Sequence, residues 1–139
     1  MDLIDDNTLS GRVIGCAIEV HRYLGPGLFE SIYDAALCDE LFHAGIGFVR
    51  QQRLKVKYKG RDLPCEFVLD FVVEQALVLE IKAVAQIHPI HEAQLLTYLR
   101  VSGLPLGLLL NFNEVMLKDG IRRRRLSRVT DRASTVSHH

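Results

Sequence analysis

The sequence predicts an α/β fold in which a mixed β-sheet is flanked by helices. Two segments with apolar residues at helical spacing open the chain, at residues 9–24 and 28–44. Strand-like runs follow within residues 48–83, and a third helical segment at 90–102 precedes an apolar strand at 107–112. A helix between two strands that must both be buried favours a mixed sheet covered by helices. The length of 139 residues fits one such domain.

The first two helices have clear start and stop signals. Thr8 or Ser10 can cap the first helix, and Gly25-Pro26-Gly27 ends it, because proline cannot continue the hydrogen-bonded turn. Gly45 and Gly47 close the second helix. The apolar stripe that we expect to be buried on the second helix comprises Ile32, Ala35, Ala36, Leu37, Leu41 and Phe42.

The strands differ in how many of their faces are buried. Apolar and lysine residues alternate over residues 54–59, which indicates a strand with one solvated face. The runs at 67–73 and 76–83 are apolar without alternation, so both of their faces should be buried. The polar break between them, Glu74-Gln75, is a hairpin signal. After the last strand, residues 113–121 are expected to be irregular or strand-like.

Composition narrows the functional classes. Lys and Arg together number 17, as do Asp and Glu, so no net charge draws the chain to nucleic acid and any contact needs a local patch. Arg122-Arg123-Arg124-Arg125 is the candidate patch, with two interpretations open: a solvated tail or a set of phosphate contacts. Cys16, Cys38 and Cys65 fit neither a disulfide framework nor a paired zinc motif, and we expect reduced core residues.

The two ends of the chain bear on localisation and domain bounds. Residues 1–6 are acidic, which excludes the basic start of a signal peptide, and no apolar run approaches the roughly 18 residues of a membrane span. We therefore expect a cytoplasmic protein without membrane contact. Residues 1–129 are expected to form the domain. Residues 130–139 are expected to be a disordered tail or, with His138-His139, the remnant of a purification tag.

Charged residues interrupt the two strands that should be buried. Asp70 lies in the first strand, and Glu80 and Lys82 lie in the second. Side chains alternate along a strand, so Glu80 and Lys82 share one face. A two-residue turn would place Asp70 opposite Leu79, whereas a three-residue connection at 74–76 places it opposite Glu80. We expect the three-residue connection, because it alone gathers the charged groups.

The same three residues suggest a metal site. Two carboxylates side by side repel each other unless a cation lies between them, and oxygen-only ligands suit Mg²⁺ or Mn²⁺ better than zinc. Lys82 would lie beside that ion, where its ammonium group can orient a water and offset charge on a phosphate. The alternative is a buried ion pair between Lys82 and Glu80 or Asp70, with no ligand.

Several motifs in order resemble a known family. Asp70 with Glu80-Ile81-Lys82 resembles the signature of the PD-(D/E)XK nuclease superfamily, although Leu69 stands where the superfamily name has proline. The run from Gly27 to Tyr33 matches the GxxExxY motif of a small family within it.

Two later segments extend this resemblance. Residues 91–99 are similar to the family's helix with glutamine and tyrosine four positions apart, and residues 111–121 are similar to its closing segment. The resemblance runs from about Leu9 to Leu126. It implies a restriction-endonuclease-like αβββαβ core with an extra N-terminal helix.

The resemblance also implies a function. It implies a metal-dependent nuclease that hydrolyses phosphodiester bonds in nucleic acid, with DNA favoured over RNA by analogy alone. Mg²⁺ or Mn²⁺ is the implied cofactor, held by Glu30, Asp70 and Glu80, while Lys82 would stabilise the attack of a water. Gln94 would orient substrate or water. The residues implied to contact substrate are Tyr33, Tyr98, Arg122, Arg123, Arg124 and Arg125.

Less specific interpretations stay open beside these roles. Glu30 could be a first-turn glutamate favoured by the helix dipole, and Tyr98 a core-edge residue with a solvated hydroxyl. His88 and His91 fit a loop and a helix start better than a metal site. The chain could also be a catalytically silent module that binds nucleic acid or a protein, a subunit of a larger complex, or a homodimer.

Overall fold

The structure, a computed structural model, describes residues 8–126. The predicted tail at 130–139, its histidines and the predicted domain end at residue 129 lie outside the described residues. The elements are, in order, α1 (Leu9–Leu24), α2 (Glu30–His43), β1 (Phe48–Tyr58), β2 (Arg61–Val73), β3 (Leu77–Lys82), α3 (Pro89–Ser102), β4 (Leu106–Asn111), the short 3₁₀ helix η1 (Leu117–Gly120) and β5 (Ile121–Arg125).

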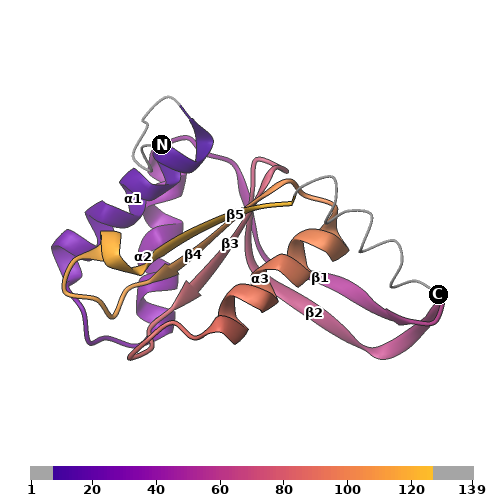
Figure 1. The fold of residues 1–139 in the computed structure, drawn as a ribbon. Helices are drawn as coiled ribbons and strands as arrows, with labels where there is room; N and C mark the ends of the chain where they lie inside the picture. The colour runs from indigo at the N-terminus through magenta and orange to yellow at the C-terminus, as the bar shows by residue number, and fades with distance from the viewer. Residues whose placement is uncertain (1–7, 127–139) are drawn as a thin grey trace.

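The strands of the described chain form one mixed sheet in the order β1-β2-β3-β4-β5 (Figure 1). β1, β2 and β3 are antiparallel neighbours, whereas β3 and β4 run parallel. Parallel neighbours need a long connection, and α3 supplies it here. β5 returns antiparallel beside β4. The expected mixed sheet is therefore confirmed.

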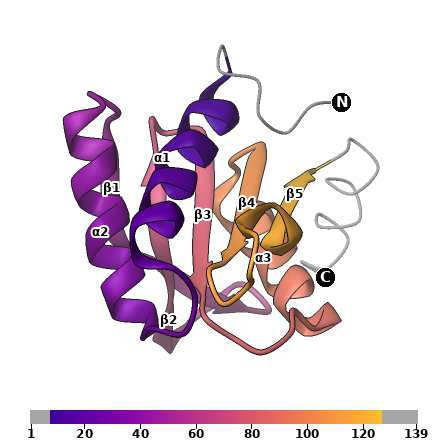
Figure 2. The ribbon, with the colours of Figure 1, turned by 90° about the vertical axis from the view of Figure 1, so that its left-hand side faces the viewer.

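The sheet separates two hydrophobic cores, since α1 and α2 cover one face and α3 covers the other (Figure 2). On the first face, Ile14 and Leu37 pack into the core that contains Ile81 of β3. On the second face, Leu95 and Leu99 of α3 belong to the other core. Covering both faces explains why the inner strands are apolar without alternation. The predicted α/β class is confirmed.

The helices follow their sequence signals with one error. The Thr8 side chain accepts a hydrogen bond from the Gly11 N–H (3.0 Å), so Thr8 is the N-cap of α1, whose bounds are as predicted. The buried stripe of α2 was predicted wrongly at Ile32, Ala35 and Phe42, all of which are exposed. The helix buries Tyr33, Asp34, Leu37 and Leu41. Within residues 8–126, no helix combines the length and apolar character needed to cross a bilayer.

Three residues connect β2 and β3, as predicted. The register pairs Val73 with Leu77, so residues 74–76 form the connection. Continued by three residues, the same register sets Asp70 opposite Glu80. The two carboxylates therefore meet across the hairpin.

The outer parts of β1 and β2 form a projecting ribbon. β3 pairs only with Phe71–Val73 of β2, so residues 52–69 continue past β3 as a two-stranded ribbon (Figure 1). We call residues 52–69 the β1–β2 arm. At its base Gln51 has a φ of 53°, a value uncommon for a residue other than glycine. Cys65 is exposed on the arm, so its predicted place in the core is wrong.

The four consecutive arginines form a strand. Arg122 to Arg125 belong to β5, which pairs with β4 from Leu106 to Leu110. The solvated-tail interpretation is therefore wrong, because backbone hydrogen bonds hold this segment against the sheet. Four residues of one type show no alternation, so the sequence gives no period by which to recognise the strand.

The β2–β3 connection predicts one stabilising substitution. Gln75 has a φ of 55° and is exposed, and this left-handed conformation strains any residue that has a Cβ but does not strain glycine. We expect Gln75→Gly to raise the free energy of unfolding by about 0.5 to 1 kcal/mol, measured by urea denaturation.

The matched control is Gln86→Gly, at an exposed bend where φ is not positive. There glycine only adds flexibility to the unfolded chain, so no gain is expected. Equal effects of the two substitutions would contradict the explanation by backbone strain.

Candidate active site

Asp70 and Glu80 lie opposite each other, and each carboxylate binds the backbone of the other strand. The Asp70 N–H donates to Glu80 Oε2 (3.0 Å), and the Ile81 N–H donates to Asp70 Oδ2 (2.8 Å). These bonds begin where the regular pairing of the two strands ends, at Phe71 and Leu79. The carboxylates thus join β2 to β3 at the point where the β1–β2 arm leaves the sheet.

Glu80 and Lys82 share a face of β3, as predicted. Ile81, between them, packs in the core beneath α1 and α2. Alternation along the strand therefore turns Glu80 and Lys82 toward the face that α3 covers. Glu80 is almost fully buried, whereas Lys82 is half-buried. The ammonium group of Lys82 is the part of this pair with more access to solvent.

Glu30 brings a third carboxylate from the first turn of α2. Burial raises the pKa of Glu30, the charge of Asp70 raises it further, and the charge of Lys82 lowers it. A hydrogen bond from the backbone of Ala83 also lowers this pKa. These interactions place the Glu30 carboxylate beside Asp70 and Lys82, at the end of β3.

Glu80 and Asp70 are held in a setting that disfavours their charged forms. Burial is the main cause that raises the pKa of Glu80 to about 8, and the charge of Asp70 raises it further. Burial also raises the pKa of Asp70, although the hydrogen bond from the Ile81 N–H opposes this change. Lys82 lowers the pKa of both groups. Near neutral pH, this pair therefore favours an added proton or cation.

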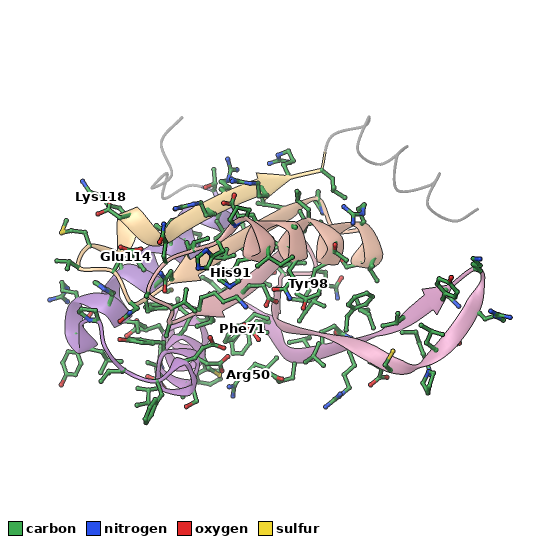
Figure 3. All side chains as sticks on the ribbon, turned by 60° about the horizontal axis from the view of Figure 1, so that its bottom comes forward. Arg50, Phe71, His91, Tyr98, Glu114 and Lys118 are labelled. Atoms are coloured by element: carbon green, nitrogen blue, oxygen red, sulfur yellow. The ribbon has the colours of Figure 1, made fainter. Side chains whose placement is uncertain are left out.

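A fourth carboxylate, Asp34, supports the group from one turn further along α2. Its charge raises the pKa of Asp70 and of Glu30. Asp34 is 9% exposed and forms an ion pair with Arg50 of β1. The Arg50 guanidinium lies 5.7 Å from the centre of the Phe71 ring, at the base of the arm (Figure 3). Sequence reasoning missed this pair, and the one available signal was an acid four positions after Glu30 on the same helical face.

α3 contributes Tyr98 and Gln94 to the other side of the site. Burial raises the pKa of Tyr98, and the charges of Glu80 and Asp70 raise it further, so the Tyr98 hydroxyl lies within electrostatic range of the carboxylates. The Tyr98 ring meets Phe67 of the arm edge-on, with ring centres 5.8 Å apart. Gln94 lies one turn before Tyr98 on the same side of α3 and is exposed.

His91 lies near Lys82, which the sequence did not predict. The His88 N–H donates to His91 Nδ1 (3.0 Å), which agrees with the expected role of both residues at a helix start. Partial burial lowers the pKa of His91, and the charge of Lys82 lowers it further. His91 therefore lies on the same side of α3 as Tyr98, near Lys82 (Figure 3). Its spacing of seven positions from Tyr98 was the signal that could have found it.

Tyr33 is fully buried, which does not fit the predicted contact with substrate. Its hydroxyl donates to the Gly25 carbonyl (2.6 Å) and accepts from the Leu28 N–H (3.0 Å). Its ring stacks on Phe112 with centres 4.7 Å apart. With no exposed surface, Tyr33 stabilises the turn that leads to Glu30.

Asn111 fastens the loop that follows Lys82. The Val84 N–H donates to Asn111 Oδ1 (3.0 Å), and Asn111 Nδ2 donates back to the Val84 carbonyl (3.0 Å). Two positions later, Asn113 Oδ1 accepts from the Gly27 N–H (3.0 Å) in the turn before α2. The end of β4 therefore holds both loops beside the carboxylates.

The arginines of β5 have internal partners. Arg122 Nε lies 3.9 Å from Glu92 Oε2 of α3, and Arg124 also forms an ion pair with Glu92. Arg123 lies on the opposite face of β5, and its Nε is buried without a hydrogen-bond partner among the described residues. Arg125, at the end of the strand, is exposed. Contact of these four residues with phosphate stays a prediction.

The carboxylates do not form a closed metal site in their present positions. Within residues 8–126, no three His, Cys, Asp or Glu side chains are arranged to hold a metal ion together. At Asp70 and Glu80, one oxygen of each carboxylate accepts a backbone N–H of the opposite strand. The donor chemistry of Glu30, Asp70 and Glu80 is nevertheless all carboxylate oxygen, which hard divalent cations such as Mg²⁺ prefer.

The comparisons with known proteins agree with this fold. A family model described as the PD-(D/E)XK nuclease superfamily matches residues 7–124. Comparison with curated proteins and comparison with solved structures each give no match. The matched span contains the whole carboxylate and lysine group.

The site predicts a fall in stability with rising pH. Burial raises the folded-state pKa of Glu80 from 4.5 to about 8, so between these values the folded protein keeps a proton that the unfolded chain releases. This stabilisation is complete below about pH 4.5 and is lost as pH rises toward 8, at up to about 1.4 kcal/mol per pH unit. Urea denaturation of metal-free protein from pH 5 to 8 measures the slope.

Two substitutions test the assignment to Glu80. Glu80→Gln removes the buried titrating group and should flatten the slope. Glu66→Gln, at an exposed glutamate on the same hairpin, should leave it unchanged. A Glu80→Gln protein with the wild-type slope would show that another group causes the pH dependence.

Proposed function

The chain belongs to the PD-(D/E)XK nuclease superfamily, and from this premise we propose that it hydrolyses phosphodiester bonds in nucleic acid, with DNA as the substrate, using Mg²⁺ or Mn²⁺. One observation supports the proposal most. The charge of Lys82 lowers the pKa of three carboxyl groups, those of Glu30, Asp70 and Glu80. Acids from α2, β2 and β3 thus lie within electrostatic reach of one ammonium group, which suits a reaction that builds negative charge on a phosphate.

Glu30, Asp70 and Glu80 are the residues that would hold the metal. A bound divalent ion supplies a Lewis acid that lowers the pKa of a water and neutralises phosphate charge. It would also offset the repulsion that raises the pKa values of these acids. Because Asp70 and Glu80 now accept backbone N–H groups, binding requires their free oxygens to turn toward a common point with Glu30.

The remaining residues have supporting roles in this proposal. The Lys82 ammonium stabilises the charge that develops as water attacks the phosphorus. Gln94, exposed on α3, orients the water or a phosphate oxygen. The Tyr98 hydroxyl, within electrostatic range of Glu80, helps Gln94 to do so. The phosphate contacts proposed for β5 are those of Arg122, Arg123, Arg124 and Arg125.

A catalytically silent module that binds nucleic acid or a protein is the second candidate. The observation in its favour is that the Asp70 and Glu80 carboxylates are already bonded to backbone N–H groups, with no closed set of three metal ligands among the described residues. In this alternative the two carboxylates stabilise the fold and have no catalytic role. Cytoplasmic location, homodimer formation and membership of a larger complex stay predictions.

Cleavage assays test the proposed hydrolysis. Purified protein is incubated with duplex DNA, single-stranded DNA and RNA in Mg²⁺ or Mn²⁺. Asp70→Asn and Lys82→Met each remove charge that acts on the reacting phosphate, so we expect each to lower the cleavage rate at least about 100-fold. The readout is the initial rate of product formation at saturating substrate.

Matched controls separate catalysis from general effects of charge. Asp39→Asn on α2 and Lys118→Met on η1 change exposed residues of the same types and should keep the wild-type rate. Cleavage that survives unchanged in Asp70→Asn and Lys82→Met would overturn the mechanism. Tight binding by the wild type without cleavage of any substrate would establish the silent module.

Metal binding has a readout that does not depend on activity. Mg²⁺ or Mn²⁺ should raise the thermal midpoint of the wild type, since a ligand at 100 times its Kd stabilises the folded state by about 2.7 kcal/mol. Glu80→Gln and Glu30→Gln each remove a ligand and should abolish most of this shift, and EDTA should reverse it. Equal shifts in wild type and both variants would place the ion elsewhere.

A further inference from the structure

The β1–β2 arm concentrates positive charge in a chain that has none overall. Residues 52–69 contain five Lys or Arg and two Asp or Glu, although the two classes are equal in the whole sequence. An excess of positive charge on one projecting ribbon of a protein with no net charge creates a strong local field there. This ribbon is the most extended part of the described chain (Figures 1 and 3).

The arm has one apolar face and one cationic face. Leu54 and Phe67 are half-buried and pack against the core beneath α3. Arg53, Lys55 and Lys57 alternate with these half-buried positions on β1 and are exposed. Alternation thus turns the three cations toward the face that does not contact α3.

The charges on this cationic face are only partly neutralised. Arg53 lies 3.4 Å from Glu66, and Lys57 lies 2.6 Å from Asp62. The remaining cations of the arm form no ion pair with a described residue: these are Lys55, Lys59 and Arg61. Protecting an edge strand from aggregation needs charge of either sign, so an excess of one sign calls for an anionic partner.

The arm is also connected directly to the candidate active site. β2 runs from the tip at Gly60 through the arm to Asp70, the first acid of the site. Six steps of extended chain from Gln52 to Tyr58 span roughly 20 Å. A duplex carries one phosphate charge per roughly 1.7 Å of its axis, so a ribbon of this length lies across several phosphates.

We propose that the β1–β2 arm binds the sugar–phosphate backbone of a nucleic-acid duplex and so brings the duplex to the site at its base; this deepens the proposed nuclease function and rests on it. A two-stranded ribbon has dimensions that a duplex groove admits. Single-strand binding relies on aromatic platforms for base stacking. The cross-strand partners of Arg53, Lys55 and Lys57 are Val68, Glu66 and Asp62, none of which is aromatic. The exposed aromatic residue near the tip, Tyr58, already has Lys59 Nζ over its ring, 5.3 Å from the centre.

Salt-dependent binding of a metal-free duplex tests the proposal. The variant Lys55→Gln/Lys59→Gln removes two cations that have no ion-pair partner and keeps the length of the side chains. Affinity for a 25-base-pair duplex is measured by fluorescence anisotropy in EDTA across a series of salt concentrations. The slope of log K against log salt should fall by about 1.8, or about 0.9 for each lost contact.

The matched control changes the same charge elsewhere. Arg12→Gln/Arg22→Gln removes two exposed cations from α1, on the layer opposite α3, and should keep the wild-type slope. Thermal unfolding of both variants verifies the fold. A wild-type slope in the arm variant, or an equal loss in the α1 variant, overturns the proposal. An equal loss for single-stranded DNA overturns the preference for a duplex.

The design also separates this proposal from the proposed function. Lys82→Met should not cleave, and because it removes at most one phosphate contact, its salt slope should fall by no more than about 0.9, half the change expected for the arm variant. If no protein cleaves and the arm variant still loses salt dependence, the nuclease proposal alone fails. If cleavage depends on Lys82 while the arm variant binds like wild type, the arm proposal alone fails.

Discussion

The fold and the site both depend on the contact between Asp70 and Glu80 across β2 and β3. Each carboxylate accepts a backbone N–H from the other strand, just where the regular pairing stops. These bonds let β2 leave β3 without exposing unpaired buried N–H groups. Because β2 separates from β3 at this point, the two outer strands form the β1–β2 arm. The Glu80–Lys82 end of β3 is then paired only on its other side, with β4. The reciprocal hydrogen bonds of Asp70 and Glu80 are thus associated with both the cluster of acids and the ribbon that projects from it.

This arrangement opposes stability. Burial raises the pKa of Glu80 to about 8, and Asp34 adds a further negative charge that acts on Asp70. Lys82 and the ion pair of Asp34 with Arg50 offset part of this repulsion. A core built only for stability would place apolar residues here, since uncompensated buried charge is costly. Unfavourable buried charge concentrated at one place is typical of functional sites.

Sequence reasoning predicted the parts of this site that lie on one strand or one hairpin. The opposition of Asp70 and Glu80 followed from the two-residue period and the length of the connection. The pair of Asp34 and Arg50 was missed because tertiary folding brings α2 to the base of β1, and no local pattern encodes that. Tyr33 was misjudged for a related reason. Its spacing to Glu30 predicts a shared helical face, but only packing against Phe112 decides that this tyrosine points inward.

The two cationic elements of the sheet differ in whether tertiary folding gives their cations carboxylate partners. β5 lies at one edge and β1 at the other, and both carry runs rich in basic residues. On β5, Glu92 of α3 already pairs with Arg122 and Arg124, so a phosphate has to displace a carboxylate there. On the arm, Lys55 lies opposite Glu66 but forms no ion pair with a described residue, so a phosphate meets weaker competition there. The first encounter with a polyanion should therefore occur at the arm, and contacts at β5 should follow once the nucleic acid lies across the sheet.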